Sequence, residues 1–314
     1  MNNPLVSLIV PCYNVASVCD KFFESILLQT YHIIEIVLVN DGSTDNTEEK
    51  LMYYKEKLEK SGFQVKYIYQ ENKGLGGAIN TGLKIFTGDF LCWADPDDYF
   101  ENNSFELRVQ YMQEHPECAV VTSDAYIRNG DLVSLVSSGI PKCNEWNQFE
   151  LLIKKESIFC SGCHMVRTSA FEEVNPQRDI YEYRRGQNWQ LLLPLYYSFE
   201  RHFLNIPLYN YLVYESSMSH IKENYIEKQQ KNSEHLNTII QTIKRMNISK
   251  TEKTIIINGA EKIYCRFAMD IAYSYGKTKD YYNSFKQLIN TDQLNYKYYI
   301  KLFIILFKKG LSNE

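Results

Sequence analysis

The feature that most constrains this chain is a short apolar run that ends in three closely spaced carboxylates. Residues 90–93 read as a buried strand, and Asp95, Pro96, Asp97 and Asp98 follow. Because proline fixes φ and ends strand pairing, the acidic residues lie in a turn at the carboxyl end of the strand. Like charges this close repel, and a hard divalent cation with oxygen ligands, Mg²⁺ or Mn²⁺, relieves the repulsion. Taken alone, the same residues also fit an ordinary acidic surface turn.

The residues before this turn repeat one unit: a strand, a turn and a helix. Short apolar and β-branched runs predict strands at 6–10, 35–39, 65–69 and 90–93. Helical spacing and capping residues predict helices at about 18–30, from Ser43 or Thr44 to about 62, and at 74–85. Four such units in about 95 residues are typical of a parallel sheet with helices on both faces, an α/β fold.

The regular alternation of strands and helices ends after Ser123. A helix at 104–114 and a strand at 119–122 continue the sheet before that point. Beyond it, the patterns predict a strand at 157–166, a helix at 187–198, one or two strands at 202–214, and helices from 221 onward. We therefore predict a main α/β domain over residues 1–220 and a helical C-terminal extension over residues 221–314.

Charge and composition restrict the classes of partner. The 314 residues carry a formal net charge of −4, which gives no indication of nucleic-acid binding. Residues 221–314 carry +7 and the remainder −11, a distribution that suggests an anionic surface as partner for the tail. Solvated helix faces explain the same distribution equally well.

Cysteine usage and the absence of long apolar runs bear on location. The chain has eight scattered cysteines, no signal-peptide pattern at its start, and no apolar run of the roughly 20 residues that span a membrane. We expect a reduced, cytoplasmic protein. Cys160-Ser-Gly-Cys163 is a single CxxC without a second pair, which disfavours a zinc site there.

Two common nucleotide-binding motifs are incomplete or absent in this sequence. After Gly74 and Gly76, the third glycine of the dinucleotide fingerprint falls on Ile79, and the chain contains no GxxxxGK[ST]. A Rossmann dehydrogenase and a P-loop enzyme are therefore disfavoured. Glycines before a helix can still bind phosphate through backbone N–H groups, or can serve only a tight turn.

The turns that follow the first four strands supply complementary groups. They are residues 11–14, 40–43, 72–74 and 95–98. Parallel strands bring these turns to one edge of the sheet, where ligands of α/β folds bind. The turns offer an aromatic face, a carboxylate for a base N–H, backbone and a lysine for phosphate, and a metal cage. Together they predict a site for a nucleoside diphosphate with a metal ion.

These turns, read in order, resemble the family 2 glycosyltransferases, which have the GT-A fold. The segments that carry the resemblance are Val-Pro-Cys-Tyr-Asn at 10–14, Val-Leu-Val-Asn-Asp-Gly-Ser-Thr-Asp at 37–45, Asn-Lys-Gly-Leu-Gly-Gly-Ala-Ile-Asn-Thr-Gly-Leu at 72–83 and Asp-Pro-Asp-Asp at 95–98. The resemblance is specific over residues 5–100 and thins toward 220. It implies a GT-A nucleotide-diphospho-sugar transferase fold, with a Rossmann-like, mostly parallel sheet, and an inverting transferase that uses Mn²⁺ or Mg²⁺.

The resemblance also implies roles for individual residues. Those assigned to the nucleotide sugar are Pro11, Tyr13, Asn14, Asp41, Asn72, Lys73, Gly74, Asp95 and Asp97. Pro11, Tyr13 and Asp41 would hold the base, most often uracil, and Asp95 would face the ribose and sugar. The metal ligands implied are Asp97, with Asp98 as a second candidate, and His220, although a loop histidine is as often merely solvated.

The residues at the position expected for the general base differ from the family pattern. The acidic pair expected there falls on Gln187 and Asn188, and an amide cannot take the acceptor's proton. We predict that Gln187, Asn188 and stacking on Trp189 position the acceptor, unless these residues only cap their helix. The carboxylates that could act as base are Asp179, Glu182, Glu172 and Glu173.

Two functions remain open. The favoured one is a hexosyl- or N-acetylhexosaminyltransferase that moves a sugar from a nucleotide-diphospho-sugar, most often a UDP-sugar, to surface polysaccharide, wall polymer or lipid-linked glycan. The alternative is a nucleotide-sugar-binding subunit of low intrinsic activity that supports a partner transferase. A nucleotidyltransferase is disfavoured, because its glycine-rich signature is expected where residues 11–14 stand.

The apolar tail suggests where the protein acts. Residues 296–310 are bordered by lysines and too short to span a bilayer. They predict either a peripheral contact with the inner face of the cell membrane or a buried terminal helix.

Overall fold

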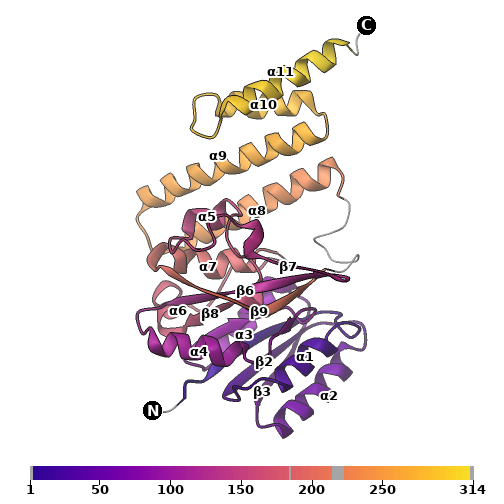
Figure 1. Ribbon diagram of the computed structural model, residues 1–314, viewed down its shortest axis with the longest axis vertical. Coiled ribbons are helices and arrows are strands. Elements are labelled where there is room, and N and C mark those ends of the chain that lie inside the picture. Colours follow the sequence, from indigo (N-terminus) through magenta and orange to yellow (C-terminus); the bar gives the residue numbers. More distant parts are fainter. Residues whose placement is uncertain (1–2, 184, 214–222, 312–314) are drawn as a thin grey trace. The chain divides into compact units, whose positions relative to one another are not determined.

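The structure is a computed structural model that describes residues 3–183, 185–213 and 223–311. It divides into two compact units, Met1–His220 and Ile221–Glu314 (Figure 1). The first unit contains the sheet, and the second consists of helices.

The N-terminal unit is built on one nine-stranded sheet (Figure 1). Its strands are β1 (Val6–Cys12), β2 (Ile34–Asp41), β3 (Gln64–Gln70), β4 (Phe90–Trp93), β5 (Tyr99–Phe100), β6 (Val120–Asn129), β7 (Leu132–Leu135), β8 (His164–Arg167) and β9 (Arg201–Leu212). Its helices are α1 (Asp20–Leu27), α2 (Thr47–Lys60), α3 (Gly74–Ile85), α4 (Ser104–Glu114), α5 (Phe149–Ile153), α6 (Thr168–Val174) and α7 (Gln187–Ser198), with 3-10 turns η1 (Ser137–Gly139) and η2 (Ser161–Cys163).

The strand order creates a switch point in the sheet. The order is β3-β2-β1-β4-β8-β6-β9-β5, with β7 paired to β6. The first four strands are parallel to one another, whereas β8 pairs antiparallel with both β4 and β6. The chain runs from β1 to β3 in one direction and then returns to place β4 on the other side of β1. Such a reversal opens a crevice at the carboxyl ends of the strands, where α/β folds bind their ligands.

Both faces of the parallel strands are covered, and β1 shows how. Val6, Leu8 and Val10 belong to one buried cluster with the apolar residues of α1, α2 and α4. Ile9 points to the other face, where α3 packs closely: a Cβ on Gly82 would lie 2.5 Å from Ile9 Cγ2. Every residue of β1 and β2 is therefore buried, as expected of a parallel sheet between two helix layers.

One charged residue lies inside this core. The Glu35 side chain in β2 is fully buried and accepts hydrogen bonds from Lys66 Nζ at 2.6 Å, Ser7 Oγ at 2.7 Å and the Thr87 amide at 3.0 Å. Burial alone would raise the pKa of Glu35, but these hydrogen bonds outweigh it and lower the pKa. The carboxylate thus links β1, β2, β3 and the turn before β4.

We expect Glu35→Gln to destabilise the protein by about 2 kcal/mol at pH 7, because charge-assisted hydrogen bonds are each worth roughly 1.5–3 kcal/mol. Since the folded-state pKa is below the unfolded one, the contribution is complete above the unfolded pKa of about 4.3 and is lost progressively as the pH falls below it toward the folded-state pKa. Urea unfolding at pH 7 and at pH 4 measures both effects. Glu59→Gln, which removes an exposed partner of Lys55, is the control and should change little. Equal effects of the two variants would contradict the prediction.

Two sequence predictions about the elements need correction. The strand predicted at 157–166 is confined to β8, because residues 161–163 form a 3-10 turn. The helix predicted to start at Ser43 or Thr44 begins at Thr47, since those two residues bind Asn14 instead. The strand predicted at 119–122 does continue the sheet, as β6, which joins the parallel strands through the antiparallel β8.

The C-terminal unit consists of four helices in the part of the chain that is described. They are α8 (Tyr225–Arg245), α9 (Lys250–Ser274), α10 (Thr278–Leu288) and α11 (Tyr296–Leu311). Reciprocal capping boxes start α8 at Asn224 and α9 at Ser249. A buried cluster that includes Tyr281, Phe285 and Ile305 joins α9, α10 and α11. None of the helices within the described residues is both long enough and apolar enough to cross a bilayer.

Candidate active site

The turns after β1 and β2 are joined by side chain–backbone hydrogen bonds. Asn14, with φ of 52°, donates its amide to Ser43 Oγ at 3.1 Å, and its Oδ1 accepts from the Thr44 amide at 2.8 Å. The Val15 amide donates to Thr47 Oγ1 at 2.7 Å. Asn14 therefore holds the loop, while the neighbouring Tyr13 remains 49% exposed and offers its ring to a ligand.

Asp41 connects the end of β2 to the start of α3. Its side chain is buried, and Oδ1 accepts hydrogen bonds from Gln70 Nε2 at 2.6 Å and from the Lys73 amide at 2.9 Å. Gly42 follows with φ of 68°, and a Cβ there would lie 2.8 Å from the Asn72 amide nitrogen. The structure thus brings together Asp41, Asn72 and Lys73, three of the residues predicted to bind the nucleotide sugar.

The glycine-rich start of α3 is crossed by another part of the chain. A Cβ on Gly76 would lie 2.6 Å from the carbonyl oxygen of Tyr183, and the Gly76 amide donates to that oxygen at 2.9 Å. The Gly74 amide donates to Asn72 Oδ1 at 3.1 Å. The sequence predicted that this backbone binds phosphate, but the amides of Gly74 and Gly76 already donate to other groups of the protein. The exposed Lys73 is therefore the group in this turn that remains for a phosphate.

The three carboxylates after β4 have different surroundings. Asp95 Oδ2 accepts from Ser161 Oγ at 2.8 Å. Asp98, 3% exposed, accepts from the Leu212 amide at 2.8 Å and so fastens the end of β9. No hydrogen bond from another described residue reaches the Asp97 carboxylate, which makes it the most available ligand of the three.

Burial raises the pKa values of all three groups, and the charge of Asp97 adds to the effect at Asp95 and Asp98. Burial, followed by the charge of Asp97, raises the pKa of Asp95 to about 6. Burial raises the pKa of Asp97, and burial together with the charge of Asp97 raises that of Asp98 well above its usual value. An oxygen-ligand set whose charges destabilise one another fits a hard divalent cation.

The sheet register places these turns at one edge. Cys12 pairs with Asn40 and Asp41 with Gln70, so β1, β2 and β3 end at nearly the same level. The last residue of β4, Trp93, pairs with Ile9, so β4 ends three residues before β1 on the same side of the sheet. The carboxylates lie beside the switch point between β1 and β4.

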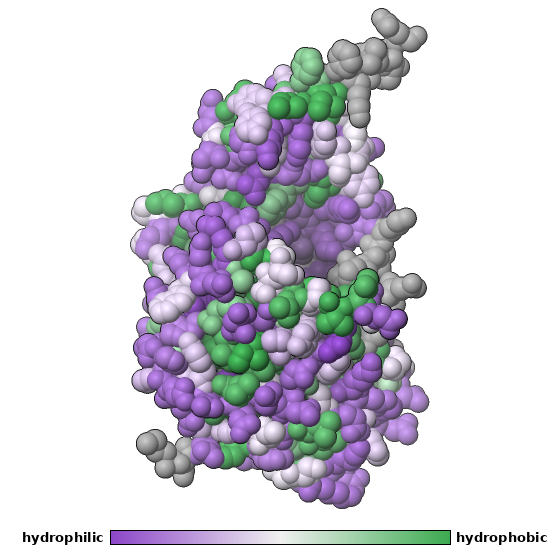
Figure 2. All heavy atoms as spheres, in the orientation of Figure 1, coloured by the Kyte–Doolittle hydropathy of each residue, from purple (hydrophilic) through white to green (hydrophobic). Residues whose placement is uncertain are grey.

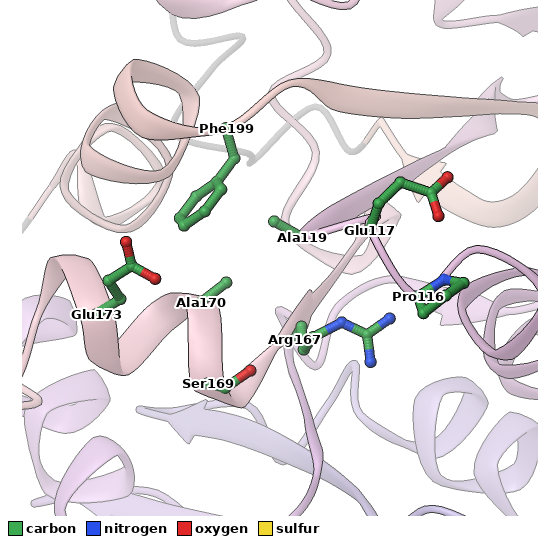
Figure 3. A pocket seen from close by; sticks show the side chains of 8 residues that line it. All are labelled: Pro116, Glu117, Ala119, Arg167, Ser169, Ala170, Glu173 and Phe199. Carbon is green, nitrogen blue, oxygen red and sulfur yellow. The ribbon is translucent and has the colours of Figure 1, made fainter.

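The pocket drawn in Figure 3 lies at the opposite edge of the sheet. It has a volume of about 190 Å³, and the residues that line it are Pro116, Glu117, Ala119, Arg167, Ser169, Ala170, Glu173 and Phe199. Arg167 pairs with Phe90, the first residue of β4, whereas the carboxylates follow the last. Glu173, one candidate base, lines this pocket and is therefore too distant to act at the strand-end site, which is formed by the turns after β1 to β4.

The expected acceptor side is more buried than the sequence suggested. Asn188 is 3% exposed: its Oδ1 accepts from Trp93 Nε1 at 2.7 Å, and its Nδ2 donates to the Phe159 carbonyl at 2.7 Å. Trp189 is also buried, with Nε1 donating to the Leu152 carbonyl at 3.1 Å. The predicted stacking of an acceptor on Trp189 is therefore wrong, because the ring belongs to the core. Gln187 is buried as well.

Glu182 is the candidate base nearest the strand-end site. Tyr183 contacts the first turn of α3 through Gly76, whereas Ile180 bonds to Asn80, one turn further along that helix, at 2.6 and 2.8 Å. Glu182 is exposed beside Tyr183 at the site's edge, and Asp179 lies toward the far end of the segment. Another candidate, Glu172, forms an ion pair with Arg178.

Two residues that bind Asp95 could not have been recognised from the sequence. Ser161 lies between the two cysteines of the CxxC, and the sequence of that segment suggests only a possible zinc motif. The hydroxyl of Tyr209, 114 residues away in sequence, donates to the Asp95 carbonyl at 3.4 Å. All eight cysteines are free thiols. The predicted ligand His220 lies outside the described residues.

Comparison with known proteins identifies the family. Residues 7–175, more than half of the chain, match the family described as Glycosyl transferase family 2. The chain belongs to this family. An uncharacterized glycosyltransferase of Rickettsia typhi is 38% identical over 112 residues, which are 36% of this chain and 33% of that protein. Glycosyltransferase GlyA of Streptococcus pneumoniae is 40% identical over 110 residues, 35% of this chain and 15% of that protein. The chain thus spans a third or less of the length of these two relatives.

Solved structures show the same fold. S. aureus TarS 1–349 in complex with UDP has a TM-score of 0.62 at 20% identity, covering 86% of this chain and 75% of that one. The mannosyltransferase PcManGT from Pyrobaculum calidifontis, in complex with GDP-Man and Mn²⁺, has a TM-score of 0.57 at 16% identity, covering 98% and 85%. The expected family 2 membership and GT-A fold are confirmed.

Proposed function

We propose that this glycosyltransferase moves a sugar from a nucleotide-diphospho-sugar, most simply a UDP-sugar, to an acceptor hydroxyl with inversion at the anomeric carbon. The observation that carries the proposal is the grouping of Asp41, Lys73 and residues 95–98 beside the β1–β4 switch point. The complexes of TarS with UDP and with UDP-GlcNAc support this choice of donor.

The proposed donor site follows from the roles that the family pattern implies for the residues of these turns. Pro11, Tyr13 and Asp41 receive the base, with the exposed Tyr13 ring as the stacking surface. Lys73 lies beside the diphosphate, where its charge favours the phosphate oxygens. Asp95, oriented by Ser161, faces the ribose and sugar.

Asp97 is the principal metal ligand in this proposal. Asp98 supports it from a position fixed by the Leu212 amide, and His220 is a further proposed ligand. Mn²⁺ or Mg²⁺, when bound there, would act as a Lewis acid that stabilises the charge developing on the departing diphosphate. The Mn²⁺ in the PcManGT complex supports the assignment. On the opposite face of the sugar, Glu182 takes the proton of the attacking hydroxyl.

A thermal-shift screen tests the donor proposal. The full chain is heated with UDP-sugars and with GDP-sugars, each with and without Mn²⁺. We expect a UDP-sugar with Mn²⁺ to raise Tm the most, because a ligand at 100 times its Kd stabilises the folded state by about 2.7 kcal/mol. A larger rise with a GDP-sugar would overturn the choice of base.

A second candidate function rests on the buried Asn188. Both ends of its amide are used within the protein, so the position that the family pattern gives to a carboxylate supplies no base. This favours a nucleotide-sugar-binding subunit of low intrinsic activity that supports a partner transferase. Release of UDP from a UDP-sugar, measured with candidate lipid-linked or polysaccharide acceptors, separates the two: turnover by the isolated chain excludes the subunit function.

α11 supports the proposed contact with a membrane. Among the side chains of this helix described up to residue 305, five apolar ones are exposed at helical spacing: Tyr296, Tyr299, Ile300, Phe303 and Ile304. Figure 2 shows apolar side chains at the surface of this end of the C-terminal unit. The other side of the helix packs inward through Tyr298, Leu302 and Ile305. Such a helix fits the boundary between lipid headgroups and acyl chains.

We expect the double substitution Ile300→Ser with Phe303→Ser to lower binding to anionic liposomes by at least tenfold without lowering Tm. Burying each side chain in lipid is worth about 1.5–3 kcal/mol, and neither is buried in the folded unit. Vesicle sedimentation measures the effect. The matched control is Ile226→Ser with Ile255→Ser, two exposed isoleucines on α8 and α9. Equal losses in both variants would count against a specific role of α11.

A further inference from the structure

A second group of potential metal ligands lies in the N-terminal unit, away from the strand-end carboxylates. One ligand atom from each of His115, Glu117 and His202 lies within 4.8 Å of the other two. His115 and Glu117 follow the end of α4, and His202 is the second residue of β9. His202 pairs with Val121 at the start of β6, which places the cluster at the edge that carries the pocket of Figure 3.

The His202 ring is already held in place. Trp146 stacks on its face, with ring centroids 4.9 Å apart and planes at 22°. The Tyr111 hydroxyl lies 3.1 Å from His202 Nδ1, and the Tyr111 ring lies against His115 at 4.4 Å between centroids. A histidine that binds a metal usually has a hydrogen-bond partner on its ring that fixes orientation and tautomer, and Tyr111 is such a partner.

The backbone that carries the other two groups is also fixed. The Arg167 guanidinium donates to the carbonyls of Met112 at 2.9 Å, Cys118 at 3.2 Å and His115 at 3.3 Å. His115 Nδ1 and Glu117 Oε1 lie 3.3 Å apart. Ligand atoms in a tetrahedral zinc site lie about 3.4 Å apart, so this pair needs little movement.

We propose that His115, Glu117 and His202 bind a divalent transition metal, Zn²⁺ in the first instance. Two imidazoles and one carboxylate are a ligand set typical of zinc, with a fourth position for water. Mg²⁺ prefers all-oxygen ligands and fits the carboxylates after β4 instead. The bound ion would fasten the segment after α4 to the start of β9, so it stabilises the folded unit.

The test uses the full chain without a histidine tag, stripped with a chelator and titrated with Zn²⁺ alone by calorimetry at pH 7.5, with Tm measured in parallel. We expect one equivalent to bind tightly and Tm to rise, because the carboxylates after β4 lack the imidazole ligands that favour Zn²⁺ and bind it more weakly. His115→Ala and Glu117→Gln should each weaken binding by at least about 100-fold, since loss of a second-shell partner alone costs about 10–100-fold. Tyr111→Phe should weaken binding by about tenfold.

Two controls make the outcome decisive. His32→Ala removes an exposed histidine of the same unit and should leave Zn²⁺ binding unchanged. Asp97→Ala removes the strand-end ligand and should leave it unchanged as well. The proposal is overturned if the wild type binds no Zn²⁺, if binding survives both His115→Ala and Glu117→Gln, or if Asp97→Ala alone abolishes it. His202→Ala is left out as a primary test because that side chain is buried and its loss can unfold the protein.

Discussion

Asp97→Ala should abolish the Mn²⁺ dependence of UDP binding and slow sugar transfer by about 1,000-fold. A metal ion that stabilises the departing diphosphate contributes several kcal/mol, and each 1.36 kcal/mol is a factor of ten in rate. Asp97 is the carboxylate to change because Ser161 binds Asp95 and the Leu212 amide binds Asp98, whereas no other described residue donates to it. Removing it also removes one of the repelling charges, so the fold should survive.

The matched control is Asp89→Asn. Asp89 precedes the opposite end of the same strand, β4, where its carboxylate accepts from the Leu5 amide at 2.8 Å. Loss of this exposed contact should leave the UDP affinity and its metal dependence unchanged. Calorimetric titration of UDP with and without Mn²⁺ compares the two variants. If Asp97→Ala keeps the wild-type metal dependence, the ion is held elsewhere and the assignment is wrong.

The sequence predicted the parallel half of the fold well because its signals are local. The helices expected at 74–85, 104–114 and 187–198 have those bounds in the structure, and β4 spans the predicted 90–93. Glycine, proline and β-branched residues mark such boundaries within a few positions. The strand-end location of Asp41 and of the carboxylates then follows from the parallel order alone.

What the sequence could not predict depends on contacts between distant segments. Trp93 and Asn188 are 95 residues apart, and Asp98 and Leu212 are 114 apart. Nothing local distinguishes an asparagine that positions an acceptor from one whose amide links β4 to the segment at Phe159. The same holds for Trp189, whose aromatic character suggested stacking and whose burial shows a core residue. Pairing of β8 between β4 and β6 is equally a long-range result.

Burial of Asn188 moves the search for the general base to the segment before α7. Gln190 holds this segment by accepting from the Tyr181 amide at 2.6 Å and donating to its carbonyl at 3.0 Å. Together with the contact between Gly76 and Tyr183, this fixes the backbone on both sides of Glu182 while its carboxylate stays exposed. A fixed backbone with a solvent-facing carboxylate at the site's edge suits a group that must reach an acceptor.

Glu182→Gln should therefore lower kcat by about 10²–10⁴-fold, the usual contribution of a general base, and leave the Kd for UDP unchanged. Asp179→Asn, further from the strand-end site, is the matched control and should change kcat by less than about threefold. Asn188→Asp should not increase the rate, because it replaces the donor to the Phe159 carbonyl with a buried carboxylate oxygen that repels it. UDP release over a range of acceptor concentrations measures all three. If Asn188→Asp is faster than wild type by tenfold, or if no carboxylate substitution between residues 172 and 182 slows transfer by more than tenfold, the base is not Glu182.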